Sequence, residues 1–140
     1  MQQFVYDLYV KYSNEPIERR ISLARTAYRK TEEHLRKIYD SWNAFNGILC
    51  LTLMCLSGDG NLTQRDYDLF RQVSDTTPTY NELYDMATSL NYQLIIDKYR
   101  VGGQEMLAQA LILCATMFAC KGSYGRDEQA LVDALSKYYA

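Results

Sequence analysis

Residue types on which enzyme chemistry often depends are scarce in this 140-residue chain. It has a single histidine, His34, in the charged segment EEHLRK, which we expect to face solvent. General acid and base catalysis needs a histidine or a perturbed acid in a cleft. Gly102 and Gly103 lack the downstream Lys and Ser or Thr of a phosphate-binding loop, and no nucleophile elbow occurs. The sequence therefore predicts that the protein is not an enzyme and has no catalytic residues.

The cysteines do not have the spacing of a zinc site. Cys50 and Cys55 are five positions apart, and Cys114 and Cys120 are six positions apart, all within strongly apolar segments. Zinc sites usually need closer pairs together with further Cys or His ligands. We therefore expect four reduced cysteines that act as small core hydrophobes.

Long apolar runs and an excess of one charge are also missing. The longest apolar run, Ile48 to Leu56, is too short to span a bilayer, and no secretion signal stands at the N-terminus. The net charge of -2 gives no reason to expect electrostatic attraction of polyanions to this protein. These features predict a single domain over residues 1–140, located in the cytoplasm, with no membrane span.

Helical periodicity runs from end to end, and sustained alternation typical of strands is almost absent. Two segments, about 42–57 and 104–120, are apolar on nearly all sides and should lie at the centre of the domain. Amphipathic helices are expected near the N-terminus and at about 64–73, 80–90 and 126–138. A further helix could run from 92 to 99, where the YQLII run at 92–96 is ambiguous. The predicted fold is all-α, a compact bundle of about seven helices.

The second amphipathic segment near the N-terminus, which begins at about Ile17, carries a heptad-like stripe of apolar residues and a basic face. The stripe consists of Ile17, Ile21, Ala24, Tyr28, Thr31, Leu35, Ile38 and Trp42. It could pack on the two apolar helices, which we favour, or could mediate self-association. Seven basic residues and two acids lie between Arg19 and Lys37, but this spacing is typical of a solvated helix in a chain that is acidic overall. We expect no nucleic-acid partner.

The 13 tyrosines, with Tyr6, Tyr138 and Tyr139 near the chain ends, favour a protein partner or self-association.

One local pattern occurs twice, and each copy has an apolar helix, a glycine turn and a short helix that opens with an acid. The first copy starts at Ile48 and the second at Leu111. At a fixed offset, Gly60 aligns with Gly122 and Asp66 aligns with Glu128. A repeated supersecondary unit indicates two pseudo-repeated halves.

Helix capping explains most of this pattern. Thr63 can cap the helix that follows the first turn, and Asp66 at its third position can reach back to the cap. Gly125 and Glu128 stand in the equivalent places of the second copy. Asp59 has no such capping role, so a second function for the acids stays open.

The same residues resemble the TerB-like, tellurite-resistance family. The resemblance lies in an apolar helix, DG-x-[LI], an acid six residues after the glycine, and an apolar residue three further on, over roughly 48–135. It implies two pseudo-repeated helical halves, a cytosolic location, a link to stress response, and an acidic divalent-cation site without established catalysis. Residue by residue, Asp59, Asp66 and Glu128 match the acidic positions, whereas Lys121 replaces the second DG aspartate.

We therefore expect a non-catalytic TerB-like protein, a stress-response scaffold whose weak metal site uses Asp59, Asp66 and Glu128. No cofactor is expected apart from this divalent cation. The alternative is a protein interaction module, or a homo-oligomer, that uses the N-terminal helices and has no metal role.

Overall fold

The computed structural model describes residues 1–58, 60–74, 76 and 78–137, and within them it contains eight α-helices and no strand. In chain order they are α1 (Gln2–Ser13), α2 (Ile17–Arg36), α3 (Ser41–Leu56), α4 (Gln64–Val73), α5 (Tyr80–Thr88), α6 (Tyr92–Arg100), α7 (Gly103–Lys121) and α8 (Arg126–Ser136). The predicted all-α fold is confirmed. The expected number of about seven was too low by one, because the ambiguous YQLII run forms a full helix.

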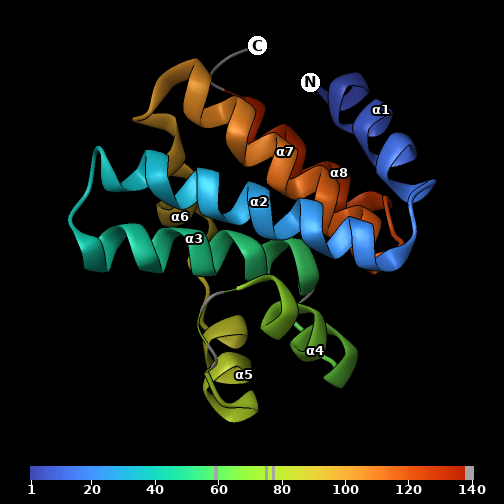
Figure 1. The fold of residues 1–140 in the computed structure, drawn as a ribbon. Coiled ribbons are helices and arrows are strands. Elements are labelled where there is room, and N and C mark those ends of the chain that lie inside the picture. The colour runs from blue at the N-terminus through green and yellow to red at the C-terminus, as the bar shows by residue number, and fades with distance from the viewer. Residues whose placement is uncertain (59, 75, 77, 138–140) are drawn as a thin grey trace.

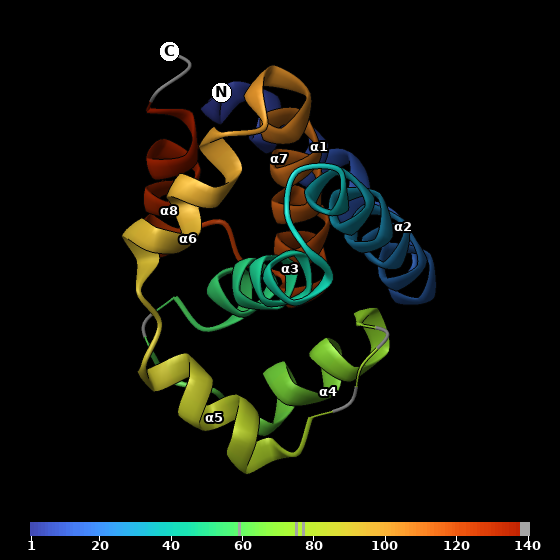
Figure 2. The same ribbon diagram turned by 90° about the vertical axis from the view of Figure 1, so that its left-hand side faces the viewer.

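The helices are arranged around α3 and α7. Helix α7 packs against α1, α2, α3, α6 and α8, and α3 also contacts α4 and α5. In Figure 1, α2 and α3 run side by side across the molecule, with α7 and α8 on one side and α4 and α5 on the other. Figure 2 looks nearly along α3 and shows α6 and α8 beside α7, with α4 and α5 beneath α3.

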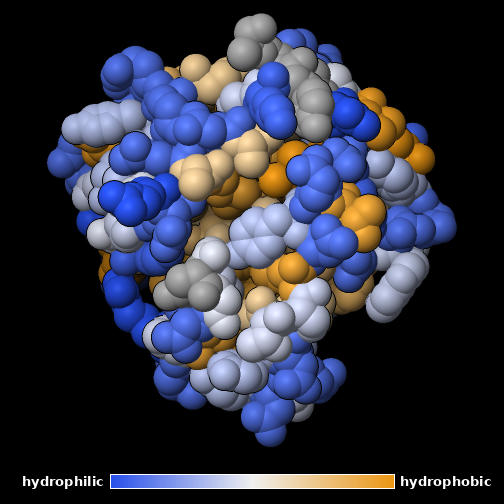
Figure 3. All heavy atoms as spheres, turned by 180° about the vertical axis from the view of Figure 1, so that it is seen from behind, coloured by the Kyte–Doolittle hydropathy of each residue, from blue (hydrophilic) through white to orange (hydrophobic). Residues whose placement is uncertain are grey.

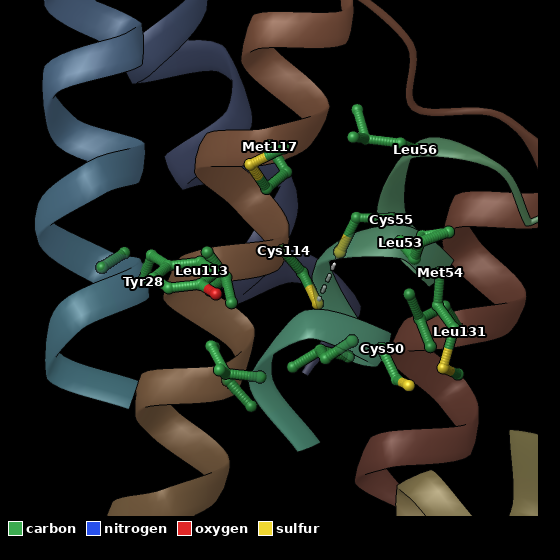
Figure 4. Packing of buried hydrophobic residues seen from close by; sticks show 14 of the residues in the cluster. Tyr28, Cys50, Leu53, Met54, Cys55, Leu56, Leu113, Cys114, Met117 and Leu131 are labelled. Atoms are coloured by element: carbon green, nitrogen blue, oxygen red, sulfur yellow. Dashed lines mark hydrogen bonds between the residues drawn. The ribbon is translucent and has the colours of Figure 1, made fainter. Parts of the chain in front are cut away.

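The two apolar segments form the centre, as predicted. Helix α3 is buried at Ala44 and from Gly47 to Leu56, and α7 is buried almost continuously from Met106 to Cys120. Figure 4 shows side chains from both helices meeting in the core. From behind, hydrophobic residues reach the surface in small groups separated by hydrophilic ones (Figure 3). This distribution places most of the apolar side chains between α3, α7 and the helices that cover them.

Helix α7 is long and apolar enough to cross a membrane by length and composition alone, but 67% of its apolar window is buried inside the fold. The core helix of a soluble protein passes the same test. The absence of a membrane span stays a prediction.

Side-chain caps explain where several helices begin. The Asp40 carboxylate accepts a hydrogen bond from the Asn43 amide at 2.8 Å and starts α3. Thr63 and Thr79 each open a helix with a complete capping box. The Asn91 side chain caps α6. These interactions satisfy amide groups that have no partner within the helix, so a short run such as YQLII can be helical.

The heptad-like stripe of α2 is only partly buried. Its central residues Ala24, Tyr28 and Leu35 are at most 1% exposed, and α2 packs against α7 and α3 as we favoured. Ile38 is 42% exposed, and Trp42 belongs to α3 and is 69% exposed. Ile17, at the start of the stripe, is also 42% exposed, so the stripe packs through its middle and emerges from the core at both ends.

Candidate functional site between the two glycine turns

The two aligned glycines both adopt left-handed backbone conformations. Gly60 has φ +77° and its amide donates to the Ser57 carbonyl at 2.9 Å, shortly after α3 ends. Gly122 has φ +81° and its amide donates to the Phe118 carbonyl at 2.7 Å, closing α7. Neither position would crowd an added Cβ, so the backbone conformation rather than space favours glycine.

These two turns line one hollow, which we name the two-turn pocket. It has a volume of about 760 Å³ and is bounded by the end of α3, the starts of α4 and α8, and the end of α7. Its lining residues are Leu56, Gly58, Asn61, Thr63, Arg65, Asp66, Lys121, Gly122, Ser123, Gly125, Arg126, Asp127 and Glu128. The fold thus brings together two segments that are far apart in the sequence.

Asp66 lies in the wall of the pocket and is only 8% exposed. Its Oδ2 accepts a hydrogen bond from the Thr63 amide at 3.2 Å, and the Thr63 hydroxyl accepts one from the Asp66 amide at 3.1 Å. This reciprocal pair is the capping box predicted from the sequence. Asp66 is therefore held in place by the start of α4.

Glu128 takes the equivalent position at the start of α8 and is 6% exposed. Its carboxylate accepts a hydrogen bond from the Ser123 hydroxyl and lies 3.7 Å from the ammonium nitrogen of Lys121. Burial opposes ionisation, but the Ser123 hydroxyl, the Lys121 charge and backbone amides outweigh it and lower the pKa of Glu128. Glu128 is thus a carboxylate stabilised in its charged form.

Lys121 joins the two sides of the pocket. Its Nζ donates to the carbonyl oxygen of Cys55 at 3.3 Å, in the last turn of α3. From the opposite direction, the Arg65 guanidinium donates to the Lys121 carbonyl at 3.0 Å. These two bonds connect the end of α3 and the start of α4 to the end of α7.

The structure brings two of the three nominated acids together. Asp66 and Glu128 line the same pocket, whereas Asp59 lies outside the described residues. Within the described part of the chain, no three His, Cys, Asp or Glu side chains form a group that could hold a metal ion. Hard cations accept carboxylate, carbonyl and water oxygens. Whether the two carboxylates bind a cation therefore stays a prediction.

Sequence reasoning missed part of this arrangement. Arg65 and Ser123 belong to no recognisable motif, and their partners are set by how the two turns meet. Lys121 is noticeable in sequence only as a departure from the aspartate of the first turn. His34 is partly exposed near the end of α2 and is not among the residues that line the two-turn pocket.

Comparison of this chain with family models, curated proteins and solved structures gives no match. The resemblance to the TerB-like family therefore stays a prediction.

Proposed function

We propose that this protein is a non-catalytic, TerB-like helical scaffold with two pseudo-repeated halves, and that it takes a divalent cation weakly in the two-turn pocket. The link to stress response and the cytoplasmic location come from the resemblance alone.

The observation that carries this proposal is that Asp66 and Glu128 line one pocket. Both are acids at the third position of a short helix, and both are almost fully buried. A capping acid works equally well on a separate, solvated helix, so capping alone does not require the two to share a pocket. A site for a cation between the halves does require it.

The geometry also limits the affinity. The Lys121 ammonium lies beside Glu128 and must move before a cation can reach that carboxylate. We therefore expect dissociation constants of about 10⁻⁴ to 10⁻³ M, the weak end of the range of calcium sites.

Isothermal titration with calcium, magnesium and zinc chlorides tests this proposal on the wild type and on Asp66→Asn, Glu128→Gln and Asp59→Asn. We expect weak binding to the wild type and its loss in the first two variants. Asp85→Asn, on the exposed face of α5, is the matched control and should bind as the wild type does. No binding below millimolar concentration would leave the acids as helix caps only.

One observation favours the alternative, an interaction module that uses the N-terminal helices. Phe4, Tyr6 and Val10 of α1 and Ile17 at the start of α2 are 42–45% exposed. These four exposed side chains lie within the first 17 residues and would supply the apolar area of such a contact. A second copy of the chain or another protein could cover them.

Sedimentation at micromolar concentration distinguishes these possibilities for self-association. The alternative predicts a dimer that dissociates in Phe4→Ser and Val10→Ser but persists in Leu94→Ser, which removes a 63% exposed side chain elsewhere. A monomeric wild type would rule out a stable dimer through this surface.

A further inference from the structure

Two buried thiols face each other at the centre of the fold. Cys55 comes from α3 and Cys114 from α7, and they are 59 positions apart in the chain. Their sulfur atoms lie 3.6 Å apart, with the Cys55 thiol donating to the Cys114 sulfur. Figure 4 shows the two side chains pointing toward each other across the interface between the helices. Cys55 is 1% exposed and Cys114 is 0% exposed.

The other two cysteines have different surroundings. The Cys50 thiol donates to the Asn46 side-chain oxygen at 3.7 Å. Cys120 is also buried in α7, at 2% exposure, and burial raises the pKa of its thiol to about 11. Cys50 and Cys120 are therefore internal controls for the pair formed by Cys55 and Cys114.

We propose that Cys55 and Cys114 form a dithiol that a peroxide converts into a disulfide between α3 and α7. A disulfide needs sulfur atoms about 2.05 Å apart. Closing the present gap requires a movement of about 1.5 Å, within the reach of side-chain rotation and a slight shift of two packed helices.

The chemistry balances with one peroxide molecule. The sulfur of one cysteine attacks the peroxide oxygen, the O–O bond breaks, and a sulfenic acid and one water are formed. The sulfur of the other cysteine then attacks the sulfenic sulfur, the S–O bond breaks, and the S–S bond forms as a second water leaves. Two thiols are oxidised, one peroxide is reduced to two waters, and the two thiol protons end in those waters.

The core position makes this reaction slow and selective. Burial, followed by the neighbouring Cys114, raises the pKa of Cys55 well above its usual value, so little thiolate is present. Only a small uncharged oxidant can reach the pair, during local opening of the core. Once the first sulfur is oxidised, the second sulfur is already in contact and captures it before further oxidation.

The bond would join the two central helices that lead into the glycine turns. A crosslink that closes a loop of this length restricts the unfolded chain and stabilises the fold. This inference does not depend on cation binding, because it rests on the sulfur pair alone.

The test is to expose the reduced native protein to hydrogen peroxide, remove the peroxide, and alkylate the remaining thiols in denaturant. We expect two fewer alkylated thiols, a crosslinked peptide that joins Cys55 to Cys114, and alkylation of Cys50 and Cys120. The thermal midpoint should rise by about 5–10 °C and return on reduction. Four alkylated thiols after exposure continued well beyond the time that fully oxidises glutathione would overturn the proposal, as would sulfinic acid at either position.

Two alanine variants sharpen the assignment. Cys114→Ala should prevent the loss of alkylation at Cys55, whereas Cys120→Ala, a similar truncation in the same helix, should leave the crosslink intact. A crosslink between other cysteine pairs would contradict the assignment. The peptide map of the wild type decides the matter even if Cys114→Ala does not fold.

Discussion

The ammonium nitrogen of Lys121 lies 3.3 Å from the carbonyl oxygen of Cys55, so the end of α7 caps the end of α3. Carbonyl groups in the last turn of a helix have no partner within it and carry partial negative charge. Lys121 supplies both a donor and a positive charge there, and it also pairs with Glu128 at 3.7 Å. One side chain therefore links α3, α7 and α8.

Replacing Lys121 by methionine should destabilise the protein. The change keeps most of the apolar stem but leaves the Cys55 carbonyl and the Glu128 carboxylate without the ammonium group. We expect the free energy of unfolding to fall by about 1–2 kcal/mol in urea titrations. Lys37→Met, at an exposed position just after α2, should change it by less than about 0.5 kcal/mol. Equal effects of the two variants would show that the link contributes little.

The same substitution should strengthen cation binding while it weakens the fold. Removing the ammonium beside Glu128 removes both a competitor and a like charge from the two-turn pocket. We expect calcium to bind Lys121→Met at least about tenfold more tightly than the wild type, as measured by isothermal titration. Unchanged or weaker calcium binding would mean that Lys121 does not oppose the cation.

Glu128 should contribute to stability in a pH-dependent way. Its pKa is lowered in the folded state from the usual 4.5, so the contribution is complete above that pH and is lost as the pH falls through the lower folded pKa. Glu128→Gln should be less stable than the wild type at pH 7, and the difference should shrink as the pH falls below about 4.5. Urea unfolding across pH 3–7 measures this. A difference independent of pH would contradict the assignment.

The two glycines of the second turn should respond in opposite ways. Gly122 has φ +81°, so Gly122→Ala should cost about 1 kcal/mol through backbone strain. Gly125 precedes α8 with φ -101° and provides no side-chain cap, and an added side chain there meets open space. Gly125→Ser should stabilise the protein by about 0.5 kcal/mol, because serine can cap the helix. Thermal unfolding of both variants checks the contrast.

Local features of the fold could be predicted from the sequence. The capping box at Thr63 depends on residues three positions apart and forms as expected. Because the segments that form α3 and α7 are apolar on nearly all sides, they could be predicted to lie at the centre without knowing which helices pack against them. Such features depend on residues that lie close together in the chain, so they can be predicted from the sequence alone.

Features that depend on how distant helices meet could not be predicted in the same way. Trp42 continues the apolar stripe in sequence but is 69% exposed, because a new helix starts just before it. The sequence marks Asp66 and Glu128 as equivalent, yet only tertiary packing brings them into one pocket. The bond from Lys121 to Cys55 also requires α3 and α7 to end side by side.

The central claim is that Asp66 and Glu128 belong to one cation site, and amide NMR spectra during titration with manganese test it most directly. Bound manganese broadens signals of nearby amides. We predict that substoichiometric manganese broadens amides of both turns together, around residues 60–66 and 121–128, while signals of the first turn of α3, at the opposite end of that helix from the pocket, persist. Broadening confined to one turn, centred elsewhere, or absent up to about millimolar manganese would contradict the account.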